Sequence, residues 1–200
     1  MIPKIEFRYS WIYDDLFRES KETKSLFRKA GRKYPSTKVI LKYIDEIKSL
    51  WVKKEKKILD SISKNSGLKW RENKIIVYVI GGGVPGFSDP LTMRIFKDKN
   101  HFVDTLIHEL IHQIQVQDAK NWMKWWNYLE KEYKKESQTT KSHIFLDAVN
   151  YKVILDVFDK KRLQKVIRSN DKFKSYKIAW EIVQREGYEN IIKEFKERIR

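Results

Sequence analysis

The order of apolar and polar residues predicts helices along most of the chain. After Pro35 and Ser36, which can cap a helix, apolar residues recur at three- and four-residue steps, the spacing of one helix face. This predicts one long helix that ends near residues 65–67, while Gly31 marks the end of an earlier helix around residues 14–29. The apolar positions of the long helix are Val39, Ile40, Tyr43, Ile44, Ile47, Trp51, Ile58, Leu59 and Ile62.

The period changes in the middle of the chain. Residues 74–80 are mostly β-branched and are followed by glycines, so they are typical of a strand. A glycine-rich loop at residues 81–86 leads to a second expected strand at residues 91–96. Asn100 can then cap a helix that runs to about Asp118. We therefore expect a small sheet followed by a long helix.

The remainder of the chain is predicted to be helical. Trp122, Trp125, Trp126 and Leu129 lie at i, i+3, i+4 and i+7 within residues 121–135, which favours one buried helix face over a surface for stacking bases. A polar loop should follow. The other expected helices are residues 143–158, capped by Ser142, and residues 176–185 and 188–199 on either side of Gly187.

Composition favours one packed α+β domain over residues 1–200. Hydrophobic residues make up 41% and aromatic residues 14% of the chain, which is enough for a core in a chain of this length. We expect a helical part at residues 1–70, strands and the central helix at residues 71–118, and a second helical part at residues 119–200. No apolar run approaches the roughly 18 residues of a membrane span. The N-terminus also lacks a secretory pattern, so a cytoplasmic location is expected.

The absence of cysteine and the net charge restrict the kinds of metal site and partner that the protein can have. Without cysteine, disulfides, thiol nucleophiles and Cys-ligated zinc are excluded, so a metal must take His and carboxylate ligands. The net charge of +16 favours an acidic partner such as nucleic acid. However, many lysines stand beside glutamates, as in residues 53–57 and 130–132, and such stretches usually form solvated helix faces.

One stretch of the central helix carries a metal-binding pattern. His108 and His112 are four residues apart, so both imidazoles project from one helix face, and Glu109 lies between them. Thr105 precedes the first histidine by three residues, and uncharged residues fill the stretch around the two histidines. Over about ten residues this stretch resembles the HExxH signature of the zincin metallopeptidases. The resemblance implies a zincin fold, with the small sheet packed on this helix, and a bound Zn²⁺.

A catalytic zinc site generally has three protein ligands, and His143 is the candidate for the third. It begins the helix expected after the Trp-rich one, and Asp147 lies one turn later on the same face, where it could support a ligand histidine. In gluzincins a Glu and an Asp hold corresponding positions, so the arrangement looks gluzincin-like with His in place of Glu. The motif lacks the Gly and third His of metzincins. The fallback ligands are Glu130, Glu132, Glu136 and Asp147.

These residues predict a zinc-dependent peptidase. Glu109 would act as general base and acid toward water activated by the metal, and a peptide or protein would be the substrate. The donor to the oxyanion is left open among Tyr151, Tyr176 and His101. An extended peptide could pair with the edge of the strand at residues 91–96, because added-strand pairing commonly holds peptides.

Other interpretations compete with this one. Gly81, Gly83 and Gly86 match the glycines of a dinucleotide-binding loop, but Pro85 and Pro90 interrupt the helix that should open there, so a flexible loop is expected. A nucleic-acid-binding protein with a structural metal site, or with none, would account for the charge of +16. A zincin whose N-terminal segment makes it latent is a third possibility. Substrate specificity and oligomeric state are left undetermined.

Overall fold

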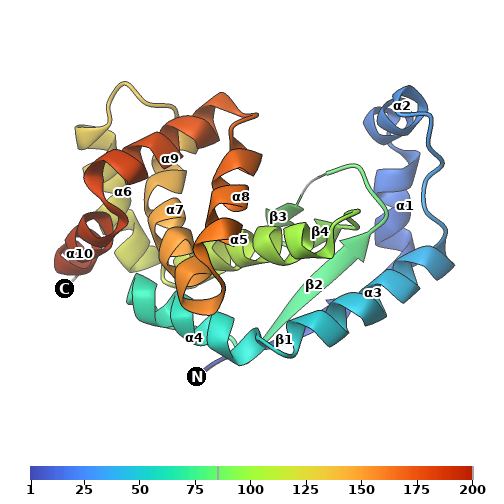
Figure 1. The fold of residues 1–200 in the computed structure, drawn as a ribbon, viewed down its shortest axis with the longest axis horizontal. Coiled ribbons are helices and arrows are strands. Elements are labelled where there is room, and N and C mark those ends of the chain that lie inside the picture. The colour runs from blue at the N-terminus through green and yellow to red at the C-terminus, as the bar shows by residue number, and fades with distance from the viewer. Residues whose placement is uncertain (85, 200) are drawn as a thin grey trace. The chain divides into compact units, whose positions relative to one another are not determined.

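The computed structural model describes residues 1–84 and 86–199, so Pro85, one of the two prolines weighed above, lies outside the described residues. Within them the protein has ten helices and a small sheet of four strands, as expected for a mostly helical chain (Figure 1). No helix of this described part is long and apolar enough to cross a membrane. The elements are β1 (Lys4–Arg8), α1 (Trp11–Glu19), α2 (Lys21–Lys29), α3 (Thr37–Trp51), α4 (Glu55–Ser66), β2 (Lys74–Ile80), β3 (Gly86–Ser88), β4 (Leu91–Arg94), α5 (Lys99–Gln117), α6 (Ala119–Glu132), α7 (Gln138–Val157), α8 (Lys160–Asn170), α9 (Lys174–Glu186) and α10 (Tyr188–Ile199).

The contacts divide the chain into two compact units. The sheet unit comprises Pro3–Glu55 and Glu72–Glu109, and the helical unit comprises Met1–Ile2, Lys56–Arg71 and the chain from Leu110 onward. The helix α5 is continuous and contributes residues to both. Each unit is described separately, and the expectation of a single domain stays a prediction.

The sheet unit has the strand order β1-β2-β4-β3, in which β3 is antiparallel to β4 and the other pairs are parallel. The predicted strand at residues 74–80 is confirmed. Two expectations are wrong: Lys4–Arg8 is a strand and not part of a helical segment, and residues 91–94 pair on both sides, so β3 is the edge strand. The missed β1 carries the alternation of a half-buried strand, with Ile5 and Phe7 buried.

Helices cover both faces of the sheet. Phe7 pairs with Val77 in register, and its ring contacts Trp51 of α3 at 6.3 Å and Phe102 of α5 at 6.1 Å. The next residue of β2, Tyr78, points to the opposite face because side chains alternate along a strand, and its ring lies 5.2 Å from Tyr13 of α1. The start of α5 is thereby packed against one face of the sheet.

Two predicted helices are each divided in two. The helix expected around residues 14–29 is α1 followed by α2, because Ser20 ends the first and its hydroxyl accepts a hydrogen bond from Thr23 N at 3.2 Å to cap the second. The long helix expected up to residues 65–67 is α3 and α4, interrupted by a turn at residues 52–54. That turn contains no proline or glycine, and the apolar spacing continues across it. The sequence therefore gives no sign of the break.

The helical unit is built around α7, which lies among α6, α8, α9 and α10 (Figure 1). Thirteen residues of α7 are buried, including Ile144, Phe145 and Val149. The helix begins earlier than expected, because Ser137 and not Ser142 is its cap; the Ser137 hydroxyl accepts a hydrogen bond from Thr140 N at 3.1 Å. The helix α8, which was not predicted, packs against α7 through its buried apolar residues.

Candidate metal centre

Three histidines form a group that could hold a metal ion. His108 and His112 lie one turn apart on α5, and α7 brings His143 to them. One ligand atom from each ring lies within 4.8 Å of the corresponding atoms of the other two rings. Imidazole nitrogens suit several divalent metals, zinc among them. The structure thus brings together the three residues that the sequence suggested as ligands.

The His143 ring is oriented by its own helix. Its Nδ1 lies 2.7 Å from the carbonyl oxygen of Thr139, one turn earlier, and 3.0 Å from the Ser142 hydroxyl. Donation from Nδ1 to a carbonyl places the proton there and leaves the Nε2 lone pair for a ligand. Burial lowers the pKa of His143 to about 4, despite the hydrogen bond to Thr139, which raises it. A neutral imidazole with a fixed tautomer is the form that binds metal.

His112 lies in a similarly buried environment. Burial lowers its pKa to about 3, the nearby His143 lowers it further, and a hydrogen bond with the Gln115 side chain raises it. The two histidine rings meet edge to face, with centroids 5.1 Å apart. Gln115 is buried and was not singled out from the sequence. A glutamine three residues after a histidine is common on helix faces, so nothing in the pattern marks it.

Glu109 occupies a dry position beside the edge strand. Its side chain is buried, and burial alone raises its pKa to about 7. In β3 of the same unit, a Cβ built on Gly86 would lie 3.3 Å from Glu109 Oε1 and 3.2 Å from Met93 Sδ. The backbone of β3 therefore passes directly over the carboxyl group, and glycine is what permits this approach.

Asp147 is fully buried, one turn after His143. Neither of its carboxyl oxygens has a hydrogen-bond partner among the described residues, and burial raises its pKa well above the ordinary value. The expected hydrogen bond from a ligand histidine is therefore not formed in this structure. The supporting role of Asp147 stays a prediction.

The structure shows which of the fallback ligands and candidate oxyanion donors lie near the three histidines. Within the described chain, the group that could hold a metal contains no carboxylate, so Glu130, Glu132 and Glu136 are not part of it. Glu130 instead pairs with the buried Lys141 at 2.9 Å. Of the three candidate oxyanion donors, Tyr176 packs its ring 4.4 Å from that of His143, Tyr151 stacks on Tyr188, and His101 packs against Phe96.

The first glycines of the glycine-rich loop are packed and hydrogen-bonded, whereas the expectation that the loop is flexible stays a prediction. A Cβ at Gly81 or Gly82 would lie within 2.7 Å of the ring of Tyr34 or Phe27, respectively. The amide of Gly81 donates to Asp14 Oδ1 at 2.8 Å, and that of Gly82 donates to the Tyr34 hydroxyl at 3.1 Å. These amides are already used within the fold, so they do not form a cradle for phosphate.

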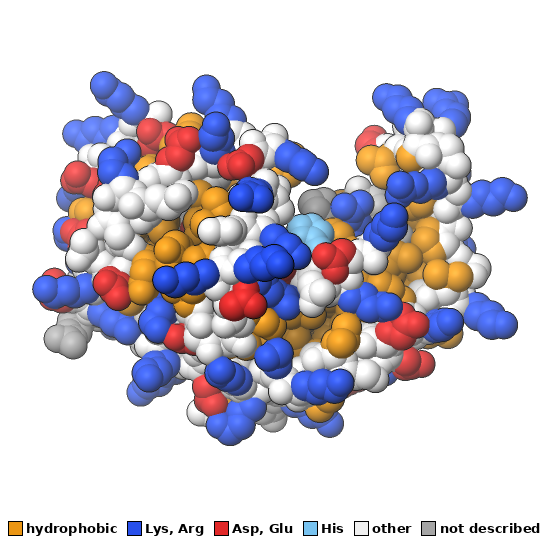
Figure 2. Space-filling view, in the orientation of Figure 1, with side chains coloured by type: hydrophobic (Ala, Val, Ile, Leu, Met, Phe, Trp, Pro, Cys, Tyr) orange, Lys and Arg blue, Asp and Glu red, His pale blue; other side chains and the backbone are white. Residues whose placement is uncertain are grey.

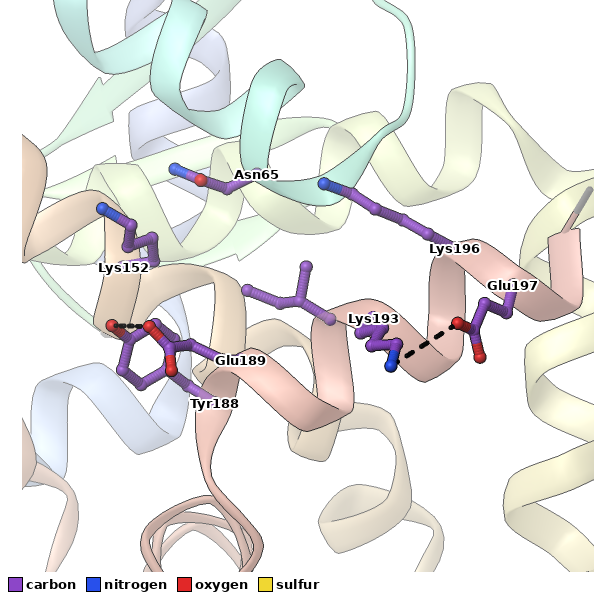
Figure 3. Close-up of a pocket in the computed structure, with 8 residues that line it drawn as sticks. Asn65, Lys152, Tyr188, Glu189, Lys193, Lys196 and Glu197 are labelled. Atoms are coloured by element: carbon purple, nitrogen blue, oxygen red, sulfur yellow. Dashed lines mark hydrogen bonds and ion pairs between the residues drawn. The ribbon is translucent and has the colours of Figure 1, made fainter.

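A pocket of about 400 Å³ lies in the helical unit, away from these residues (Figure 3). None of the candidate ligands lines it. Two of its lysines already have carboxylate partners, because Lys193 pairs with Glu197 at 4.0 Å and Lys152 pairs with Asp156. We assign it no function. Its lining residues are Asn65, Lys152, Tyr188, Glu189, Ile192, Lys193, Lys196 and Glu197.

Comparisons of the chain with protein-family models, with curated proteins and with solved structures gave no match. The resemblance to zincins consequently rests on the short stretch around His108 and His112. What the structure adds is the three-histidine group itself, which depends on no comparison. Neither the sequence resemblance nor the three-histidine group shows the identity of the metal or an enzymatic activity, so these are proposals.

Proposed function

We propose that this protein is a zinc-dependent peptidase of zincin type. The observation that carries the proposal is the convergence of His108, His112 and His143 within 4.8 Å, with Glu109 adjacent to the first of them on the same helix. The close flanks of the motif support a zincin. The use of His where gluzincins have Glu makes the site a variant of that branch.

The donor set is the reason for choosing zinc. Three imidazoles with no thiolate suit a zinc site that retains one position for water. Zinc, when bound, would supply a Lewis acid and lower the pKa of a bound water to roughly 7. The orientation of the His143 ring favours ligation, because the carbonyl group of Thr139 fixes its tautomer.

Glu109 would carry the proton in the reaction. Its carboxylate would accept a proton from the attacking water and deliver it to the amine that leaves. Its buried position limits access of bulk water, so the proton would pass from the attacking water to Glu109 and then to the leaving amine. The adjacent edge strand β3 could pair with an extended peptide and align its backbone near Glu109.

The test combines metal content with hydrolysis. Purified protein should contain about one zinc per chain, as is usual for such sites. Glu109→Gln should retain the metal but hydrolyse a casein or quenched-peptide substrate about 10²–10⁴-fold more slowly, because it lacks the base. His143→Ala should lose the metal, whereas Glu132→Ala, a change at another rejected ligand that is exposed, should retain it.

Two outcomes would remove the proposal. One is wild-type protein that contains no zinc after purification and takes up none on dialysis against it. The other is Glu109→Gln protein with wild-type activity, which would show that the hydrolysis comes from a contaminant or from another site.

A further inference from the structure

The exposed face of α8 carries an uninterrupted positive stripe. Lys161, Lys165 and Arg168 lie at i, i+4 and i+7, so they share one face of the helix, and all three are exposed. Leu163 and Val166 are buried on the side that packs into the helical unit. Figure 2 shows Lys and Arg side chains over the region where Figure 1 places α8. We call Lys161, Lys165 and Arg168 the α8 stripe.

The cations of the α8 stripe have no acidic partners in the described part of the chain. Among the described residues, none of its three side chains forms an ion pair, and Asp171 is the one carboxylate in residues 160–174. On other helices some cations pair with a carboxylate at i+4 or i−4. Such pairs are Lys56 with Asp60, Lys152 with Asp156, Lys177 with Glu181, Lys193 with Glu197, and Arg198 with Glu194.

An exposed aromatic residue connects this surface to the histidines. Phe173 follows α8 and is 58% exposed. Its ring lies 5.8 Å from Tyr176, and the Tyr176 ring lies 4.4 Å from His143. Lys172 and Lys174 flank Phe173 in sequence and are exposed. A line of ring contacts thus runs from solvent to one candidate ligand, all within the helical unit.

We propose that the α8 stripe and Phe173 bind an acidic stretch of the polypeptide substrate next to the bond that is cut. This inference rests on the proposed function and names its substrate class. Asp or Glu side chains of the substrate would lie along the α8 stripe, and an apolar side chain would contact Phe173. The surface carries positive charge and one apolar anchor, the complement of such a segment.

The dimensions and the single aromatic residue favour a polypeptide over nucleic acid. Seven helical residues separate the ends of the α8 stripe, a rise of about 10 Å, which matches about three residues of extended chain. Single-stranded nucleic acid is usually bound through several aromatic side chains on which successive bases stack. Only Phe173 is available for this along residues 160–174.

The experiment measures binding separately from cleavage. Full-length Glu109→Gln protein is titrated into a labelled peptide with three glutamates and one leucine, and into the same peptide with glutamines, by fluorescence anisotropy. We expect the glutamate peptide to bind at least tenfold more tightly at about 50 mM salt and to weaken at about 200 mM. Charge reversal of the α8 stripe (K161E, K165E and R168E) should reduce its affinity by about 10–100-fold.

A matched variant separates the α8 stripe from the overall charge. K53E, K57E and K64E make the same charge change at exposed lysines around α4, and should alter the affinity less than about threefold. Phe173→Ser should weaken binding of the leucine-containing peptide, whereas Met123→Ser, at another exposed apolar residue, should not. Circular dichroism spectra checked for each variant identify any that fails to fold, and if the charge-reversed α8 stripe does not fold, the neutral K165Q replaces it.

The inference is overturned if both charge-reversal variants lose affinity equally, if both peptides bind equally, or if a single-stranded oligonucleotide of equal charge binds the α8 stripe more tightly. Its failure is distinguishable from failure of the proposed function. A wild-type enzyme that contains zinc and cleaves both peptides at the same rate removes only the inference. Binding of the glutamate peptide through the α8 stripe by a protein that hydrolyses nothing removes only the peptidase.

Discussion

Two aspartates of this protein are fully buried, and their surroundings are opposite. Asp14 in the sheet unit accepts hydrogen bonds at both oxygens: Tyr34 at 2.6 Å and Gly81 N at 2.8 Å on Oδ1, and Arg18 at 2.9 Å on Oδ2. Asp147 in the helical unit is as deeply buried, yet neither oxygen has a partner among the described residues.

The difference indicates what each carboxyl group does. A buried carboxylate that receives several hydrogen bonds and an ion pair holds the structure around it together. A buried carboxyl group without donors costs free energy, and its presence requires another explanation. Asp14 connects α1 to the glycine-rich loop, whereas Asp147 lies one turn from a candidate metal ligand. We interpret the first as structural and the second as functional.

The largest expected effect is on Asp14. Asp14→Asn should lower the free energy of unfolding by about 3 kcal/mol, because it removes the buried carboxylate that pairs with Arg18 and faces an amide N–H toward the other donors. Urea unfolding followed by circular dichroism measures this change. Zinc content per folded chain should stay at the wild-type value. A variant as stable as the wild type would show that the network is not structural.

The matching change, Asp147→Asn, should keep the stability of the protein and weaken its zinc binding. Without metal, its free energy of unfolding should equal or exceed that of the wild type, because a costly buried carboxyl group is replaced by a neutral amide. Its zinc affinity, measured by competition with a chelating dye, should fall about 10–100-fold, the usual effect of losing a residue that supports a ligand. Loss of stability with unchanged zinc affinity would reverse our assignment of the two aspartates.

A smaller change should sharpen the description of the Asp14 network. Tyr34→Phe removes the hydroxyl that donates to Asp14 and accepts from Gly82 N. We expect the free energy of unfolding to fall by about 1–2 kcal/mol, because one buried donor and one acceptor lose a partner. Tyr9→Phe is the comparison, since its hydroxyl lies 3.3 Å from Asp14 and otherwise forms a hydrogen bond, among the described residues, only with the exposed Thr37 hydroxyl at 3.0 Å. If both variants lose the same free energy of unfolding, the short hydrogen bond from Tyr34 to Asp14 contributes no more to stability than the longer one from Tyr9.

The sequence predicted the helices with regular apolar spacing better than their ends. The strand at residues 74–80 and the helix at residues 188–199 were predicted with their observed bounds. The break at residues 52–54 was missed because tertiary packing, and not a proline or glycine, interrupts the helix. The helix α8 was missed because its two buried residues, Leu163 and Val166, give too weak a periodic signal.

The sequence predicted only those parts of the candidate site that depend on the type of side chain. His108, His112 and His143 stand out because a chain with four histidines offers few combinations. The carbonyl group of Thr139 could not be predicted, because every residue has one and only the fold selects which carbonyl faces a ring. Gln115 is likewise ordinary in sequence, and the placement of β3 over Glu109 depends on strand order.

The packing of the glycine-rich loop constrains how this protein could diverge over evolution. Gly81, Gly82 and Gly83 each face a different neighbour, since a Cβ would meet Tyr34, Phe27 or Thr23, respectively. A larger residue at Gly81 or Gly82 would be accepted only with a smaller residue at its neighbour, whereas the positive φ of Gly83 disfavours any side chain there. Among related sequences, Gly81 and Gly82 should therefore vary as two linked pairs that join the loop to the segment between α1 and α3, while Gly83 should stay glycine.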